Sequence, residues 1–71
     1  MTPLFNKDNS IKSHDVFYID KQPDPLRIVE TTTAGKGVMN TFEVVKNLKT
    51  GKFTTISRET LKSYNPFIIK L

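Results

Sequence analysis

Residues 38–57 hold the feature that most constrains how this chain can fold: two β-branched and aromatic segments on either side of the linker Leu-Lys-Thr-Gly, residues 48–51. The flanking segments, residues 38–47 and 52–57, have the composition of strands. The linker fits a type I turn followed by a bulge, with Gly51 in the left-handed region that glycine adopts without strain. This stretch therefore predicts an antiparallel β-hairpin.

Three further segments are rich in β-branched and aromatic residues and are expected to be strands: residues 16–19, 26–33 and 67–70. Between the first two, Pro23 and Pro25 predict a loop over residues 21–25, because proline lacks a backbone donor and restricts the residue before it. Ser57 is expected to cap a short helical turn over residues 58–62. The chain thus predicts five short strands, with one helical turn before the last of them.

The first fourteen residues are polar and lack any regular period, apart from Leu4 and Phe5. They are therefore expected to form a flexible or loosely packed N-terminal arm. Residues 15–71 are expected to form one small β-barrel domain, because a chain of 71 residues supports a single modest core. Within the arm, Leu4 and Phe5 either cover one end of that core or dock on a partner.

The chain contains no cysteine and a single histidine, His14, so neither a disulfide nor a structural metal site is expected, and no cofactor is indicated. A secreted domain this small would usually carry paired cysteines, so their absence favours a reducing compartment such as the cytoplasm. The longest apolar run, residues 16–19, is far too short to span a membrane. The sequence therefore predicts a soluble protein without a targeting segment or membrane partner, and it does not indicate an oligomeric state.

The strand pattern of residues 15–70 resembles the Src-homology-type (SH3-like) small β-barrel, a superfold that also contains the Tudor and KOW modules. Within it, residues 59–64, Glu-Thr-Leu-Lys-Ser-Tyr, look like the helical turn and tyrosine found before the last strand of such barrels. The resemblance implies an all-β, five-stranded barrel. It does not extend to recognition of proline-rich peptides, because the chain has no groove tryptophan. The short, lysine-rich, cysteine-free chain is also similar to small accessory proteins encoded by bacteriophages.

Positive charge is concentrated in the second half of the chain. Residues 1–35 hold four bases and five acids, a net charge of −1, whereas residues 36–71 hold seven bases and two acids, a net charge of +5. This half is expected to attract a polyanion, and lysine suits phosphate contact without base readout. The sequence therefore predicts non-specific binding of nucleic acid or a nucleoprotein complex, with Tyr64 available for base stacking. The expected contact residues are Lys46, Lys49, Lys52, Arg58, Lys62 and Tyr64.

The alternative is a protein-binding adaptor or inhibitor, encoded by a phage and acting on a host protein. In the bulged register of the hairpin, Val44 lies opposite Ile56, and Val45 and Phe53 share the other face. If the arm leaves that face open, it is an apolar interaction patch beside lysines. A free sheet edge offers a second route to a protein partner. The expected contact residues are then Val45, Phe53, Leu4 and Phe5.

No constellation of catalytic residues is present, so the chain is expected not to be an enzyme. Ser13, His14 and Asp15 are consecutive, and consecutive residues of an extended chain cannot form a hydrolase triad. Residues 35–37, Gly-Lys-Gly, lack the leading glycine and the magnesium-binding hydroxyl of a phosphate-binding loop, and a flexible hairpin tip is expected there. The prediction is a small binding module.

Overall fold

The computed structural model describes residues 2–33 and 41–69. Three predicted features lie outside these ranges: the hairpin tip at residues 35–37, the first three residues of the strand at 38–47, and residue 70 of the last strand. No helix of the described residues is long and apolar enough to cross a membrane. The elements in chain order are β1 (Thr2–Pro3), β2 (Phe17–Ile19), β3 (Gln22–Thr33), β4 (Thr41–Asn47), β5 (Phe53–Ser57), α1 (Arg58–Ser63) and β6 (Phe67–Ile68).

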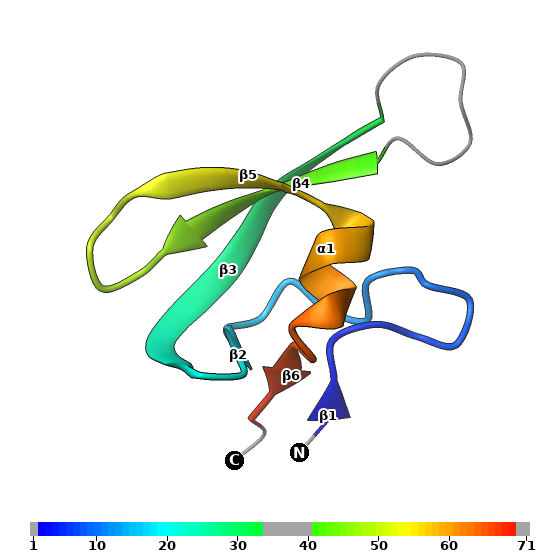
Figure 1. The fold of residues 1–71 in the computed structure, drawn as a ribbon, viewed down its shortest axis with the longest axis horizontal. Coiled ribbons are helices and arrows are strands. Elements are labelled where there is room, and N and C mark those ends of the chain that lie inside the picture. Colours follow the sequence, from blue (N-terminus) through cyan, green and yellow to red (C-terminus); the bar gives the residue numbers. More distant parts are fainter. Residues whose placement is uncertain (1, 34–40, 70–71) are drawn as a thin grey trace.

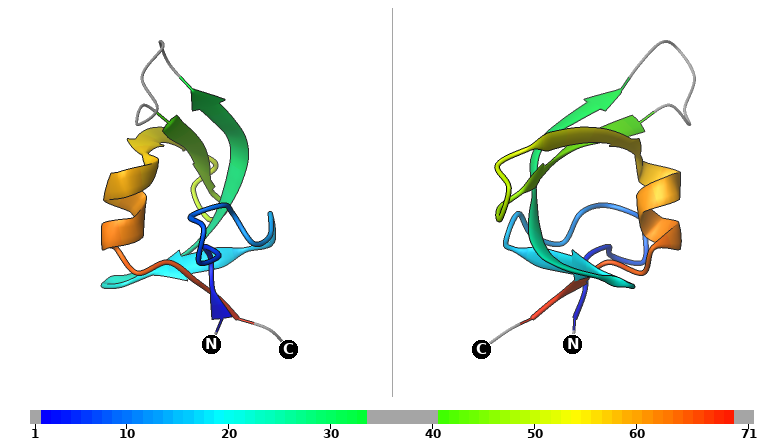
Figure 2. Two further views of the ribbon diagram at one scale, coloured as in Figure 1. Left: turned by 90° about the vertical axis from the view of Figure 1, so that its right-hand side faces the viewer. Right: turned by 60° about the vertical axis from the view of Figure 1, so that its left-hand side comes forward.

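The strands form one antiparallel sheet in the order β1-β6-β2-β3-β4-β5, which confirms the all-β class (Figure 1). The sheet has six strands, whereas five were predicted, and it is not closed: within the described residues, β1 and β5 are its two edges. The chain leaves β5 directly into α1, which packs against β4 and β5. Figure 2 shows the resulting curled, open sheet with the helix on one side.

Strand β3 is longer than predicted because the loop expected over residues 21–25 is absent. A two-residue turn at Asp20 and Lys21 joins β2 to β3, with Ile19 paired to Gln22 and Lys21 at φ 65°. Pro23 and Pro25 precede Leu26, the first residue of β3 that pairs with β4. Their missing amide donors are therefore not needed for hydrogen bonds to β4. The first half of β3 pairs with β2 and the second half with β4.

Part of the segment expected to be a loose arm belongs to the sheet and the core. Thr2 and Pro3 form β1, which pairs with β6. The next residue, Leu4, is fully buried, its amide donates to the carbonyl of Pro66, and its carbonyl accepts from Lys12. The apolar side chain and these backbone bonds hold this end of the chain against the last strand.

The core is a single cluster that draws on both ends of the chain. Leu61 is the buried residue of α1, and it packs with residues of five strands or their flanks. The predicted capping of α1 is confirmed, because the Ser57 hydroxyl accepts a hydrogen bond from the Thr60 amide at 3.2 Å. The buried hydrophobic residues are Leu4, Phe17, Leu26, Ile28, Val45, Leu61 and Ile68.

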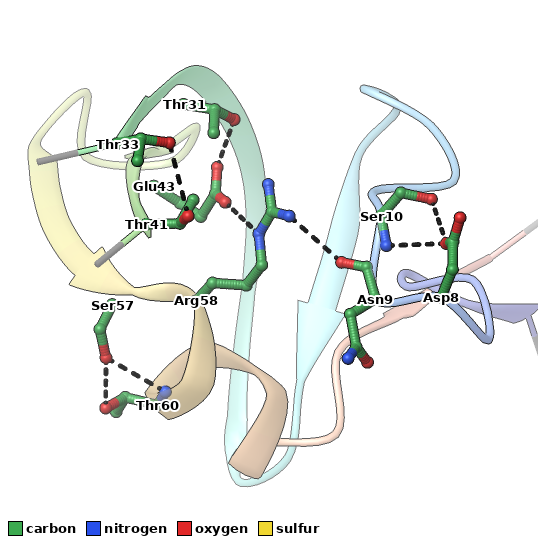
Figure 3. A network of polar contacts seen from close by, with 10 residues as sticks. All are labelled: Asp8, Asn9, Ser10, Thr31, Thr33, Thr41, Glu43, Ser57, Arg58 and Thr60. Carbon is green, nitrogen blue, oxygen red and sulfur yellow. Dashed lines mark hydrogen bonds and ion pairs between the residues drawn. The ribbon is translucent and has the colours of Figure 1, made fainter. Parts of the chain in front are cut away.

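A buried carboxylate joins the helix to the sheet (Figure 3). The Glu43 side chain on β4 is fully buried, and the Arg58 Nε at the start of α1 donates to it at 2.7 Å. The Thr31 hydroxyl on β3 donates to the second carboxylate oxygen at 2.5 Å. Arg58 also donates to the Asn9 carbonyl at 3.2 Å, so the N-terminal loop belongs to the same network.

The loop around Asn9 has its own hydrogen bonds. The Ser10 hydroxyl and the Ser10 amide both donate to Asp8 Oδ1, and these bonds lower the pKa of Asp8 below its ordinary value. A carboxyl whose pKa falls on folding contributes stability above its unfolded pKa and loses it as the pH falls through the folded value. This loop therefore keeps its geometry at neutral pH.

We expect removal of Arg58 to destabilise the fold more than removal of the whole ion pair. Arg58→Met leaves the Glu43 carboxylate buried with Thr31 alone, at a cost of about 3 kcal/mol in unfolding free energy. The double variant Glu43→Leu/Arg58→Met removes both charges and should recover most of that loss. Urea denaturation of the wild type, the single variants Glu43→Leu and Arg58→Met, and the double variant measures the coupling. Additive effects would show that the pair is not coupled.

Candidate nucleic-acid interface

The tip of the β4–β5 hairpin is held by Asn47 and Gly51. The Asn47 side-chain oxygen accepts from the Lys49 amide at 2.9 Å and the Thr50 amide at 3.1 Å. The Gly51 amide donates to the Asn47 carbonyl at 2.7 Å, and Gly51 has φ 78°, as the sequence predicted. The lysines of this turn are therefore displayed from a backbone with fixed geometry.

The register of the hairpin differs by one residue from the predicted one. The loop of residues 48–51 closes without shifting the ladder, since the Asn47 amide donates to the Lys52 carbonyl. Glu43 is consequently opposite Ile56, where Val44 was expected. Because a one-residue shift moves each side chain to the other face, Val45 lies in the core and Phe53 on the outer face.

A row of three side chains crosses the outer face of the sheet. Lys46 on β4 is paired with Arg27 on β3 and with Phe53 on β5. Directly paired residues of antiparallel strands point to the same face, so the three side chains are neighbours. The Lys46 ammonium lies 5.6 Å from the centre of the Phe53 ring, within the range of a cation–π contact. The row places two cations beside an exposed aromatic ring.

The remaining hairpin lysines lie near the tip. Lys52 pairs with Asn47 and directly precedes Phe53, so its side chain leaves on the face opposite to the Lys46–Phe53 row. Lys52 is exposed, and the Lys49 side chain is 72% exposed, with its ammonium 3.9 Å from an Asp24 carboxylate oxygen. Such a pair at the surface is worth little and is readily exchanged for another anion. We name the outer-face residues Arg27, Lys46 and Phe53, together with Lys49 and Lys52 near the hairpin tip, the basic hairpin face.

Arg58 and Lys62, which were expected to contact nucleic acid together with the hairpin lysines, do not join this face. They belong to α1, which follows the end of β5 opposite to the hairpin tip (Figure 1). Arg58 is held by Glu43, and Lys62 donates to the Asn9 side chain. Both cations therefore have structural partners, and neither is needed to describe a basic surface at the hairpin.

Tyr64 lies away from the basic hairpin face as well. It ends α1 and, together with Leu61, Ile56 and Thr54, lines an apolar groove of about 250 Å³ beside the free edge of β5. Leu26 and Val45 form part of the same lining. This groove faces a different part of the surface from the Lys46–Phe53 row, because Ile56 and Val45 point to the core side of the hairpin.

The four residues predicted for protein binding are separated by the fold. Leu4 is 0% and Val45 6% exposed, so both are core residues and cannot form an exposed patch. Phe5 is half-buried and packs against the core. Phe53, 61% exposed, is the one residue of the four whose ring is largely open to solvent.

Arg27 was not among the predicted contact residues. Its place between the buried Leu26 and Ile28 already indicated an outward side chain. Its position beside Lys46 follows from the register of β3 against β4, which local sequence does not specify.

In residues 2–33 and 41–69, no three histidine, aspartate or glutamate side chains are grouped so that they could hold a metal ion.

The chain matches no protein-family model, no curated protein and no solved structure. Because no relative suggests a function, the function is inferred from the charge and exposure of the basic hairpin face.

We expect the hairpin to tolerate Gly51→Asn better than Gly51→Ala. A Cβ at this position meets nothing within 4 Å, so the cost comes from the positive φ alone. Alanine should lower the unfolding free energy by about 1 kcal/mol, and asparagine, which adopts this conformation more readily, by less. Thermal denaturation followed by circular dichroism measures both, and equal stability of the two variants would contradict this explanation.

Proposed function

We propose that this protein is a small non-enzymatic module that binds nucleic acid, free or within a nucleoprotein complex, through the basic hairpin face. Support comes from the pairing of Arg27 with Lys46 on the outer face and from Lys52 near the hairpin tip, none of which forms an ion pair with a carboxylate of the described residues. Unpaired cations on neighbouring strands create a local positive potential that attracts phosphate.

The strand arrangement is consistent with this kind of module. We propose that the sheet is an opened variant of the SH3-like barrel. The order β6-β2-β3-β4-β5 and the helix between β5 and β6 resemble the strand pattern of that superfold, with β1 added at one edge. The fold supplies a rigid hairpin, and the proposed function depends on the side chains that it displays.

Binding is expected to weaken steeply with salt and to show little sequence preference. Four cations that contact phosphates give a slope of log K against log salt of about −3. Raising salt from about 50 to 200 mM should then weaken binding about 60-fold. Fluorescence anisotropy with labelled single-stranded and duplex oligonucleotides measures this. The proposal fails if neither is bound at low salt, or if the affinity does not change with salt.

Matched charge variants locate the surface. Lys46→Gln/Lys49→Gln/Lys52→Gln should abolish most of the binding, because it removes three phosphate contacts. The control Lys7→Gln/Lys12→Gln/Lys21→Gln removes the same charge from exposed positions outside this face and should bind nearly as the wild type does. Equal losses in both triple variants would show that net charge, and not this surface, determines binding.

A second candidate function, a protein-binding adaptor or inhibitor, is favoured by one observation. The groove lined by Ile19, Leu61 and Tyr64 lies beside β5, whose outer edge is unpaired within the described residues. An extended peptide added to β5 would gain backbone hydrogen bonds and place one apolar side chain in the groove.

Affinity capture from lysate treated with nuclease separates the two functions. Under the second candidate, a stoichiometric protein partner should persist at high salt and be lost in Ile56→Asp, which places a charge in the groove lining. Under the first, nuclease should release the co-purifying proteins. Circular dichroism of Ile56→Asp is the control for folding.

A further inference from the structure

We infer that the outer face of β3, β4 and β5 is a platform for single-stranded nucleic acid, on which an unpaired base stacks against Phe53 while Arg27 and Lys46 contact the neighbouring phosphates. This inference rests on the proposed function and adds to it the strandedness of the ligand and the role of Phe53 as the ring on which a base stacks. It also replaces Tyr64 as the stacking residue.

Phe53 has no role in the core that would account for its presence. Its side chain is 61% exposed on an edge strand, and it lies on the face opposite to the buried Val45. A large exposed ring on an edge strand favours unwanted association and is usually avoided. Bases bind aromatic rings by stacking whatever their sequence, so the ring is explained if it receives a base.

The charges beside the ring support an anionic ligand. Arg27 and Lys46 are directly paired across β3 and β4, and like charges in this position repel each other. The described residues contain no carboxylate in an ion pair with either of them. A bound phosphate would relieve this repulsion. Glu30, an acidic residue of β3, belongs to the next row of this face, opposite Val44.

The combination favours a single strand over a duplex. In a duplex the bases are stacked on each other, so a flat protein surface contacts phosphates while a phenyl ring in the same row gains nothing. In a single strand, phosphate and unstacked base are close together in each nucleotide, which matches cations and a ring on adjacent strands. The Lys46 ammonium over the ring can move to a phosphate when a base takes its place.

The test compares a labelled oligothymidine, an abasic strand of equal length and a duplex, each titrated with wild type, Phe53→Ala and Tyr64→Ala. For wild type, the oligothymidine should bind more tightly than the abasic strand. Phe53→Ala should weaken binding of the oligothymidine about 5- to 150-fold and leave the abasic strand unchanged. Tyr64→Ala, which removes an aromatic ring of the groove, should have little effect on either. Thermal denaturation of both variants verifies folding.

The outcomes separate this inference from the proposed function. Salt-dependent binding of all three ligands that Phe53→Ala does not change would overturn the stacking platform and leave the proposed function intact. Absence of binding to every nucleic acid at low salt would overturn both. A polyglutamate peptide that binds as tightly as the oligothymidine would show that the face takes an acidic polypeptide instead. Arg27→Gln should reduce the salt slope by about 1, whereas Lys62→Gln, its matched control on α1, should not.

Discussion

The buried carboxylate of Glu43 is the group on which the arrangement of sheet and helix depends. It is 0% exposed, where an unpaired charge would be costly, and its two oxygens accept from Arg58 and Thr31. These partners come from α1 and β3, so the carboxylate holds three elements in one relative position. Arg58 can reach it because the chain turns into the helix directly after β5. After the helix, β6 pairs with β1 and β2, so β5 is an edge of the sheet within the described residues.

Strand β3 connects this buried site to the exposed one. Its first half pairs with β2 and its second half with β4, and the register shifts between Ile28 and Glu30. Such a bulge bends a strand and increases its twist, which lets one strand serve both halves of the sheet. Ile28 points into the core, and Arg27, one residue earlier, points outward to Lys46. The hydrophobic core and the basic hairpin face therefore share the same strands.

Local signals predicted much of the fold. Gly51 and the segments beside it identified the hairpin, and Ser57 identified the start of the helix, because turn and cap chemistry involves residues close in sequence. What the sequence did not reveal depends on pairing between distant segments: β1 against β6, the one-residue register of the hairpin, and the partner of Arg58. Arg58 and Lys62 were counted with the hairpin lysines because charge alone does not distinguish a cation with a buried partner from an unpaired one.

The exposed Phe53 ring on the edge strand β5 favours association of two copies, and the neighbouring lysines oppose it. An edge strand with free backbone groups and a large apolar side chain would invite a second copy to pair with it. Lys46 covers one face of the Phe53 ring, and Lys52 places another charge next to it in the chain. Two copies that approach along β5 would bring these charges together, and charged side chains on an edge oppose such pairing. The features that would suit a polyanion thus also oppose edge-to-edge pairing through β5, so the ring and its lysines are best understood as a single unit.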